Sequence, residues 1–310
     1  MIATVTFNPS LDEWVTLSSL KLGVLNRAAG WSRYAGGKGI NVSRVVRELG
    51  GRTIAFGLAG GEDGTILRER LNRMTLPHVF VDVPGSTRNN YKIQSALPPA
   101  LTEINCPGPR VRAAAINRLQ RALLRQAGGL RGVALSGSLP PGVPPTIYAR
   151  WIRRLRRRRI PAVLDASGVA LRRGCGAHPW LVKPNRQEAE ELLGRRLSSF
   201  RQVVDAAQAV SRQARSIVIL SLGKEGAVLA SSGASWLARP PAVRVDSAVG
   251  AGDSLVGGLL FGWLQTGSLL EAFRLGIACG AATAMTPGTE LCHRRDVYRI
   301  LPRIKIKRVS

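Results

Sequence analysis

The stretch AVGAGDS, residues 248–254, with the apolar run LVGGLLFGWL directly behind it, decides how this chain folds. Its small residues let the backbone curl and point successive N–H groups at one spot, and the apolar run predicts a buried helix. A helix N-terminus carries unpaired N–H groups and a partial positive charge, so it suits an anion. Asp253 at that place can accept a proton from a hydroxyl that attacks a bound phosphate. Taken alone, the stretch favours an ordinary turn and cap, because Asp is a preferred residue at helix starts.

The length and composition indicate a globular α/β protein. The chain has 310 residues, of which 45% are hydrophobic, enough for one large domain or two small ones. The start, MIATVTF, predicts a strand and lacks the features of a secretory signal. The apolar run 255–264 is too short to span a bilayer. We therefore expect a cytoplasmic protein with no membrane association.

The cysteines and histidines predict no metal centre. There are four cysteines and three histidines, no C-x-x-C pair, and only Cys292 and His293 are adjacent. Neighbouring residues do not make a metal-ligand pattern, so we expect free thiols and ordinary histidines.

The net charge of +26 calls for an acidic partner to be considered. The densest basic run, RWIRRLRRRRIP at 150–161, places Trp151, Ile152 and Leu155 at helical spacing. This pattern predicts an amphipathic helix with a solvated basic face. Adventitious binding of polyanions is the alternative, and a dedicated nucleic-acid function is not expected.

Strand-like and helical runs alternate along the chain, which predicts one domain with a largely parallel sheet covered by helices. Residues 88–105 break this alternation and predict a two-stranded excursion. Ligands of such sheets bind at the carboxyl ends of the strands. Polar residues follow five apparent strand ends, which favours a shared cleft; they are Asn8 and Asp12, Ser136 to Ser138, Asp165, Lys183 to Asn185, and Ser221 to Gly223.

Three further motifs have both a functional and a structural interpretation. In YAGGKGINVSR, 34–44, the glycines permit close approach to a ligand, and Asn41 can bind sugar hydroxyls, but a tight strand-to-helix turn also fits. In VKPNRQEAEEL, 182–192, Asn185 and Glu188 can hold hydrated Mg²⁺, and they equally fit a helix cap. SLGKEGA, 221–227, is a flexible turn that can pass along phosphates. No G-x-G-x-x-G or G-x-x-x-x-G-K-[ST] motif is present.

The order of these motifs resembles the PfkB, or ribokinase-like, family of sugar kinases along nearly the whole chain, and within it the branch of 1-phosphofructokinases and tagatose-6-phosphate kinases. The matching segments are TVTFNPSLD (4–12), AGGKGINVSR (35–44), STRNNYKI (86–93), TEINCPGP (102–109), SGSLPPGVP (136–144), LVKPNRQEAEELL (181–193), SLGKEGA (221–227), VGAGDS (249–254), PGTELC (287–292) and LPRIKIK (301–307).

The resemblance implies a role for each candidate residue. Asp253 would be the general base, and the N–H groups of Gly250, Ala251 and Gly252 would form the anion hole. Substrate-binding roles fall on Asp12, Arg27, Gly37, Lys38, Gly39, Asn41, Arg88 and Ser136, with Arg27, Lys38 and Arg88 as candidates for the substrate's phosphate. The ATP side would be lined by Lys183, Asn185, Ser221, Gly223, Gly226, Gly250 and Gly252, with Asn185 and Glu188 organising Mg²⁺ through water.

The implied fold is a Rossmann-like three-layer sandwich with a small β-sheet lid, mapped onto about 13–35 and 88–105, through which related enzymes pair as dimers. The implied reaction is ATP-dependent phosphorylation of a phosphosugar, with fructose 1-phosphate the first expectation. Tagatose 6-phosphate and fructose 6-phosphate are alternatives, and a non-catalytic polyanion-binding protein on the same fold is a remote one. Ala248 stands where these kinases usually have Thr or Ser, which puts a K⁺ site at Asp246 and Ala248 in doubt.

Overall fold

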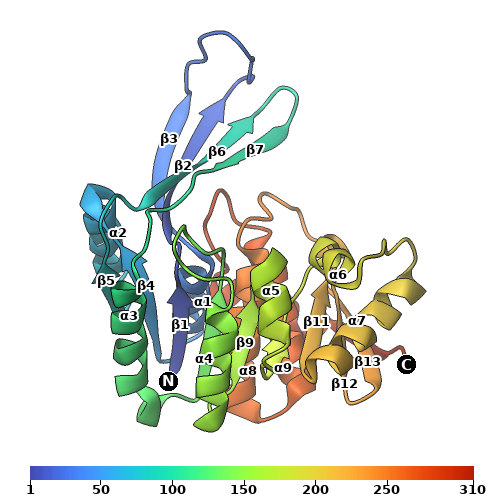
Figure 1. Cartoon of the computed structure of the whole chain (residues 1–310). Helices are drawn as coiled ribbons and strands as arrows, with labels where there is room; N and C mark the ends of the chain where they lie inside the picture. Colours follow the sequence, from blue (N-terminus) through green and yellow to red (C-terminus); the bar gives the residue numbers. More distant parts are fainter.

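The computed structural model describes all 310 residues and consists of a large sheet between two layers of helices, with a small sheet above it (Figure 1). In order across the large sheet the strands are β14 (Lys305–Arg308), β13 (Ala234–Arg239), β12 (Ala227–Ser231), β11 (Ile217–Ser221), β10 (Leu181–Val182), β9 (Ala162–Asp165), β8 (Gly132–Ser136), β1 (Ile2–Thr6), β4 (Thr53–Ala59) and β5 (His78–Asp82). The strands from β11 to β5 are parallel, and the other three are antiparallel. The expected fold class is confirmed.

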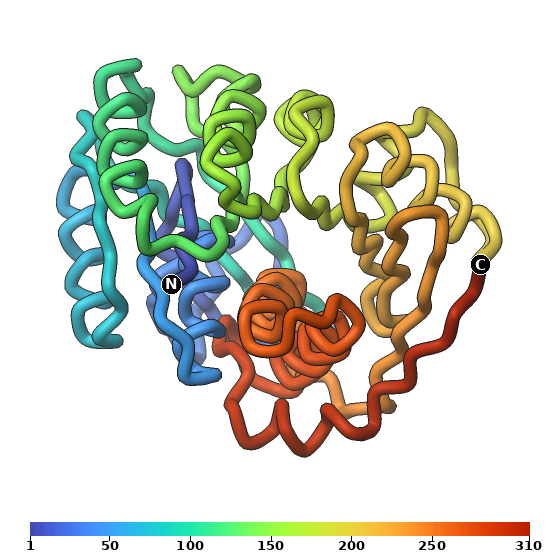
Figure 2. The backbone as a smooth tube through the Cα atoms, turned by 90° about the horizontal axis from the view of Figure 1, so that it is seen from below, coloured from blue at the N-terminus to red at the C-terminus, as the bar shows by residue number.

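Period-two alternation in the strands builds the two cores. On β8, Val133 and Leu135 point to one face while Ala134 points to the other. The first face is covered by α3 (Ala113–Arg125), α4 (Ile147–Arg157), α5 (Gly168–Cys175), α6 (Arg186–Leu193) and α7 (Phe200–Ala214). The second face is covered by α1 (Lys38–Glu48), α8 (Ala251–Thr266), α9 (Leu269–Thr283) and α10 (Arg294–Ile300), and α2 (Gly61–Arg73) packs beside β4. Seen from below, the two groups of helices lie on opposite sides of the strands (Figure 2).

Helix α8 is buried on nearly every side, as its apolar run predicts, and glycine lets it pack closely. A Cβ at Gly257 would lie 2.8 Å from Cβ of Val45 on α1, and one at Gly258 would lie 2.5 Å from Sγ of Cys279 on α9. The close contacts with both neighbours fix the position of the N-terminus of α8.

The basic run forms the expected amphipathic helix, α4. Trp151, Ile152 and Leu155 are buried, and the arginines between them are exposed. Two elements were not anticipated: α5, a short helix with glycine near both ends, and β14, a short basic strand at the sheet edge. The strand that ends before Lys183 is short and covers only Leu181–Val182.

The small sheet has the order β3 (Gly30–Gly36), β2 (Ser10–Leu17), β6 (Arg88–Ser95) and β7 (Ala100–Asn105). β2 pairs parallel with β6, and the outer strands are antiparallel to their neighbours. One face carries Asp12 and Asn90 and lies toward the large sheet, whereas the opposite face carries Trp31, Tyr91 and Ile104, all exposed.

The four cysteines form no disulfide. None of the helices is both long and apolar enough to cross a membrane.

Candidate active site

The site is organised by the N-terminus of α8, at the carboxyl edge of the large sheet. Gly250 is its N-cap residue and has φ 80°, a left-handed conformation that favours glycine. No side chain caps the helix. The N–H of Ala251 donates to the carbonyl of Ala248 at 3.3 Å, whereas the N–H groups of Gly250, Gly252 and Asp253 have no partner. Of the expected anion hole, Gly250 and Gly252 are thus free donors, and Ala251 is already engaged. The first turn therefore presents unpaired N–H groups beside an acid.

Asp253 is buried, and its Oδ2 accepts a hydrogen bond of 2.8 Å from Nδ2 of Asn41 on α1. Burial, with a smaller effect from the charge of Asp165, raises the pKa of Asp253 to about 6, against the opposing effects of Lys38, Asn41 and Lys183. A carboxylate with a pKa just below neutrality is deprotonated at pH 7 and still a good proton acceptor, as a general base must be.

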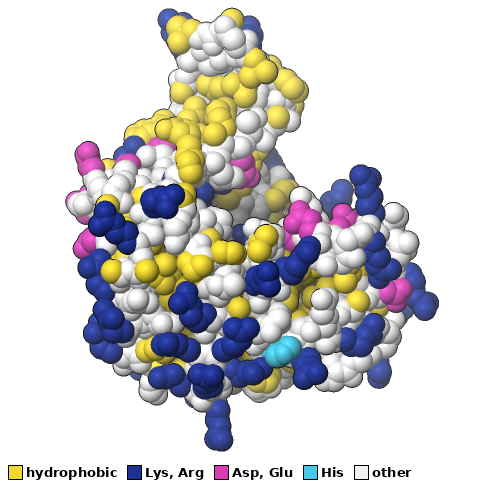
Figure 3. Space-filling model, viewed as in Figure 1, with side chains coloured by type: hydrophobic (Ala, Val, Ile, Leu, Met, Phe, Trp, Pro, Cys, Tyr) yellow, Lys and Arg dark blue, Asp and Glu magenta, His cyan; other side chains and the backbone are white.

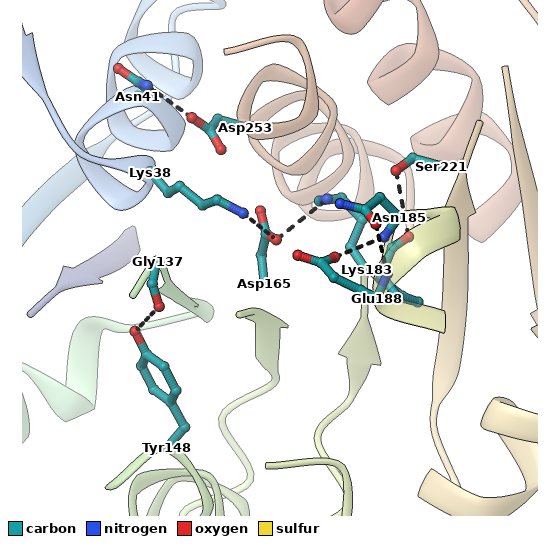
Figure 4. Close-up of polar contacts among 11 residues, drawn as sticks. Lys38, Asn41, Gly137, Tyr148, Asp165, Lys183, Asn185, Glu188, Ser221 and Asp253 are labelled. Atoms are coloured by element: carbon teal, nitrogen blue, oxygen red, sulfur yellow. Dashed lines mark hydrogen bonds and ion pairs between the residues drawn. The ribbon is translucent and has the colours of Figure 1, made fainter. Parts of the chain in front are cut away.

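Asp165, at the end of β9, is fully buried between two lysines (Figure 4). Its Oδ1 lies 3.0 Å from Nζ of Lys38 and 3.4 Å from Nζ of Lys183. Burial alone would raise the pKa of Asp165, but the two ammonium groups hold it below its ordinary value. Asp165 likewise raises the pKa of Lys38. The cluster carries two positive charges for one negative charge, so it can attract a second anion.

Several buried polar atoms at the carboxyl edge of the sheet have no partner within the protein. They are Thr6 Oγ1 at the end of β1, Asn8 Oδ1 just after it, Ser136 Oγ on β8 and Asp165 Oδ2 on β9. Ser136 and Asp165 are register partners on neighbouring strands. Buried polar groups are nearly always hydrogen-bonded in folded proteins, so unpaired groups gathered at one edge mark the place of a polar ligand.

The start of α6 forms a complete capping box. The N–H of Glu188 donates to Oδ1 of Asn185, the N–H of Asn185 donates to Oε2 of Glu188, and both distances are 2.8 Å. The structural interpretation of this pair is thus correct, and it leaves the second carboxylate oxygen of Glu188 free. No three acidic, His or Cys side chains are grouped closely enough to hold a metal ion without other ligands.

On the far side of α6, Ser221 ends β11 and its Oγ donates to the carbonyl of Pro184 at 3.4 Å. Gly223 and Gly226 follow with φ 59° and 96°. A Cβ at Gly226 would collide with the carbonyl of Ala238 on β13, so only glycine fits there. This turn lies beside Asn185, which forms an isolated bridge with Ser221.

The small sheet contributes Asp12 and Arg88. Oδ1 of Asp12 accepts from Ser10 at 2.7 Å and from Asn90 at 3.2 Å, and Gly36 is close enough that a Cβ there would touch the same carboxylate. The Arg88 guanidinium donates to the carbonyls of Cys106 and Asn8, each at 3.1 Å, and leaves its buried Nε unpaired. Burial lowers the pKa of Arg88.

The structure does not bring every candidate together. Gly37 and Gly39 flank Lys38 where the chain enters α1, and both pack against Thr6. Arg27 is exposed in the connection between β2 and β3, at the far tip of the small sheet (Figure 1). Asp246 and Ala248 are also exposed.

Asp165 was expected at the shared cleft but was given no role, and Asn90 was not singled out as a candidate. Its place after a buried strand marked Asp165 as a polar residue of the cleft. Nothing in the sequence around Asp165 reveals that it pairs with two lysines. Asn90 sits in the expected excursion, and its alternation places it on the face of Asp12. A hydrogen bond near the site also escaped the sequence: the hydroxyl of buried Tyr148 donates to the carbonyl of Gly137 at 2.9 Å and holds the loop that follows β8.

Comparisons with known proteins agree with this geometry. A sequence profile of the pfkB family carbohydrate kinases matches residues 5–295. The chain is 35% identical to a 1-phosphofructokinase of Bacillus subtilis over 100% of both proteins, and 34% identical to one of Escherichia coli over 99% of this chain and 98% of that protein. The solved structure of Escherichia coli phosphofructokinase-2 in complex with potassium superposes with a TM-score of 0.91 at 31% identity, covering 97% of this chain and 98% of the other.

A match across almost the entire chain, together with identities above 30% over full-length relatives, identifies the family. Membership of this family also accounts for the buried Asp253 at the uncapped N-terminus of α8, beside the cluster of Lys38, Asp165 and Lys183. This chain belongs to the pfkB family of carbohydrate kinases, which transfer a phosphoryl group to a sugar hydroxyl.

Proposed function

We propose that this protein is a 1-phosphofructokinase, which transfers the γ-phosphoryl group of ATP to fructose 1-phosphate and forms fructose 1,6-bisphosphate. The observation that carries the proposal is the geometry around Asp253: a buried carboxylate, held by Asn41, on the same helical turn as unpaired N–H groups. The names of the full-length relatives support fructose 1-phosphate as acceptor.

Asp253 takes the proton from the attacking sugar hydroxyl. Its hydrogen bond to Asn41 orients Oδ2 and leaves Oδ1 for the substrate. The N–H groups of the first turn of α8 face the phosphoryl group during its transfer and stabilise the negative charge that develops on it. Lys38 and Lys183, held by Asp165, add positive charge beside this turn, where Nζ of Lys183 lies 3.5 Å from the place that a Cβ of Gly252 would take.

Asp12 binds sugar hydroxyls from the small sheet, with Ser136 and Asn41 at the large sheet. A carboxylate already fixed by Ser10 and Asn90 does this well, because little side-chain freedom is lost on binding. Lys38 and Arg88 are the cations assigned to the phosphate of the acceptor: the Lys38 side chain is partly exposed, and the buried Nε of Arg88 has no partner within the protein.

ATP lies between the start of α8 and the turn that follows β11. The left-handed glycines Gly223 and Gly226 shape this turn, and Lys183 reaches toward the phosphates. The donor set also fits Mg²⁺, since Asp165 has an unpaired buried oxygen and Glu188 has one oxygen outside the capping box. These two carboxylates, with Asn185, would hold the hydrated ion, which neutralises charge on the phosphoryl oxygens during transfer.

A monovalent-cation site at Asp246 and the backbone of Ala248 is a further part of the proposal. Phosphofructokinase-2 of Escherichia coli has been solved with potassium. Ala248 supplies a carbonyl but no hydroxyl, so we expect activity to depend weakly on K⁺. Replacing K⁺ by Na⁺ at constant ionic strength, in this protein and in Ala248→Thr, measures that dependence.

The small sheet acts as a lid and as the interface of a homodimer. Trp31 is 60% exposed and Ile104 is 49% exposed on a sheet face that nothing in the chain covers. Figure 3 shows hydrophobic side chains gathered over this part of the molecule. Arg27, at the tip of the same sheet, lies too far out to reach its own site; in a dimer it is available to the partner.

The acceptor is tested with a panel of sugar phosphates and an ADP-release assay. Fructose 1-phosphate should give the highest kcat/KM. A higher value for fructose 6-phosphate, which phosphofructokinase-2 of Escherichia coli binds in a solved structure, or for tagatose 6-phosphate would reassign the acceptor within the same reaction. Turnover restricted to unphosphorylated sugars would contradict the phosphosugar assignment.

A further inference from the structure

A cavity of about 760 Å³ opens at the edge of the large sheet opposite the candidate active site. It lies at the amino-terminal ends of β9, β10 and β11, and its lining includes Ala162 and Ile217, where two of these strands begin. Asp165 ends β9 on the opposite edge, so the length of that four-residue strand, roughly 10 Å, separates Asp165 from Ala162 at the cavity. The cavity is therefore distinct from the sugar and ATP sides of the active site.

Four arginines line this cavity: Arg156 and Arg159 at the end of α4, and Arg212 and Arg215 at the end of α7. None of the lining residues is acidic, and none of these arginines takes part in an ion pair. Figure 3 shows Lys and Arg side chains gathered over the lower half of the face drawn, with few acids between them. Four guanidinium groups around one cavity, without counter-charges, repel one another unless an anion joins them.

The backbone around the cavity is left-handed at four non-glycine residues. Arg159, His178, Arg215 and Ser232 have φ of 57°, 56°, 48° and 51°, and only one other non-glycine residue of the chain has a positive φ. Glycine suits such positions better, especially after a helix. Each of these four positions instead carries Arg, His or Ser, whose side chains can all bind phosphate. An arginine at a helix C-terminus also interacts favourably with the helix dipole. Anion binding and stabilisation of the helix end are therefore two separate roles for these arginines.

The cavity is the size of a small-molecule site, and Trp180 gives it an apolar wall beside the arginines. The guanidinium fork matches phosphate oxygens in a bidentate manner. We propose that this cavity binds a small molecule with two or more clustered phosphoryl groups. Nucleoside triphosphates, sugar bisphosphates and inorganic polyphosphate share that chemistry.

The test is calorimetric titration of the full chain with inorganic tripolyphosphate. The lining variant is Arg156→Ala/Arg212→Ala. The matched control is Arg154→Ala/Arg157→Ala, which removes two exposed arginines of α4 that do not line the cavity and changes the net charge equally. We expect the lining variant to lose at least tenfold in affinity and the control to lose less than twofold, with kcat unchanged in both.

Equal weakening in the two variants would overturn the proposal, because diffuse positive charge would then explain the binding. Unchanged affinity in the lining variant would also overturn it, since the anion would then sit elsewhere, such as at the start of α8. Arg215→Gly provides a second variant that should fold, because glycine suits φ 48°. Its Tm should not fall, whereas its affinity should; an unchanged affinity there, too, counts against the site.

Titrations with ATP and with fructose 1,6-bisphosphate identify the source of the phosphates. Each can also bind at the active site, so the informative signal is a second binding event that the lining variant loses and the control keeps. Such an event with either compound supports the proposal and shows which molecular framework the cavity accepts. If no compound, tripolyphosphate included, gives a component that depends on the lining arginines, the proposal fails.

Discussion

At Asp253, burial and hydrogen bonding act on one carboxylate in opposite directions. Burial raises its pKa to about 6, while Asn41 and the nearby lysines favour the charged form. A general base works only when deprotonated, so kcat/KM should fall about tenfold per pH unit below pH 6. Asp253→Asn should lower kcat by about 100-fold or more and largely spare ATP binding. Steady-state kinetics across pH, with a nucleotide-binding titration, measure both; a near-normal kcat in the variant would refute the assignment.

Asp165 holds two lysines at the site, and its removal would leave the buried Lys183 ammonium without a counter-charge. We expect Asp165→Ala to lower the free energy of unfolding by about 3 kcal/mol. Asp82→Ala is the control, since Asp82 pairs with Arg68 at the surface and is 85% exposed; it should cost less than about 1 kcal/mol. Denaturant unfolding measures the free energy of unfolding of both variants. Equal losses would show that the buried cluster contributes no more to stability than the surface ion pair does.

The depressed pKa of Asp165 also links stability to pH. In the unfolded chain the Asp165 carboxylate binds a proton at higher pH than it does in the folded protein. The contribution to stability is therefore complete above the ordinary carboxyl pKa of 3.8 and is lost as pH falls below it. Asp165→Ala should flatten that part of the acid-unfolding curve, whereas Asp82→Ala should not.

Helix α8 fixes the turn at its own N-terminus because it packs so closely on its neighbours. In Gly258→Ala the added Cβ would meet Sγ of Cys279 at 2.5 Å, so we expect a loss of about 1–3 kcal/mol in stability from overpacking. Gly128→Ala is the matched change, with nothing within 4 Å, and should stay within about 0.5 kcal/mol. Thermal unfolding compares the two variants, and a silent Gly258→Ala would show that α8 can shift.

At the start of α6, a conservative change separates the cap from the proposed metal role. Gln can complete a capping box as Glu does, so Glu188→Gln should retain stability. It removes a carboxylate charge, so the Mg²⁺ concentration for half-maximal activity should rise several-fold. Asn185→Ala should instead cost about 1 kcal/mol of stability. An unaltered Mg²⁺ requirement in Glu188→Gln would leave Glu188 with only its capping role.

At the scale of the whole molecule, the homodimer proposed above would assemble through the small sheet. Trp31→Glu places a charge on the exposed apolar face and should convert the homodimer to a monomer in sedimentation velocity. Val169→Glu on α5 is the control, since Val169 is 59% exposed and Trp31 60%. A dimer that persists in Trp31→Glu, or a wild-type monomer, would contradict assembly through this face.

Much of the molecule follows from local pattern. The alternation of strands and helices predicted the parallel sheet, and helical spacing predicted the buried side of α4. Local pattern failed for α5 and β14, because an element of eight residues and one of four are too short for periodicity to show. Pairing with β13 is what makes the basic segment at 305–308 a strand.

The sequence by itself determined most of the elements and the small-residue turn before Asp253, since turn chemistry, helix capping and alternation act over a few residues. The tertiary structure alone decided which charges meet. Lys38 and Asp165 are 127 residues apart, and Asn41 and Asp253 are 212 apart. These contacts depend on strand order and on the packing of α8 against α1. The same packing buries an ordinary-looking acid at a helix start and raises its pKa, because a carboxylate's pKa responds to desolvation and neighbouring charges rather than to its place in the chain.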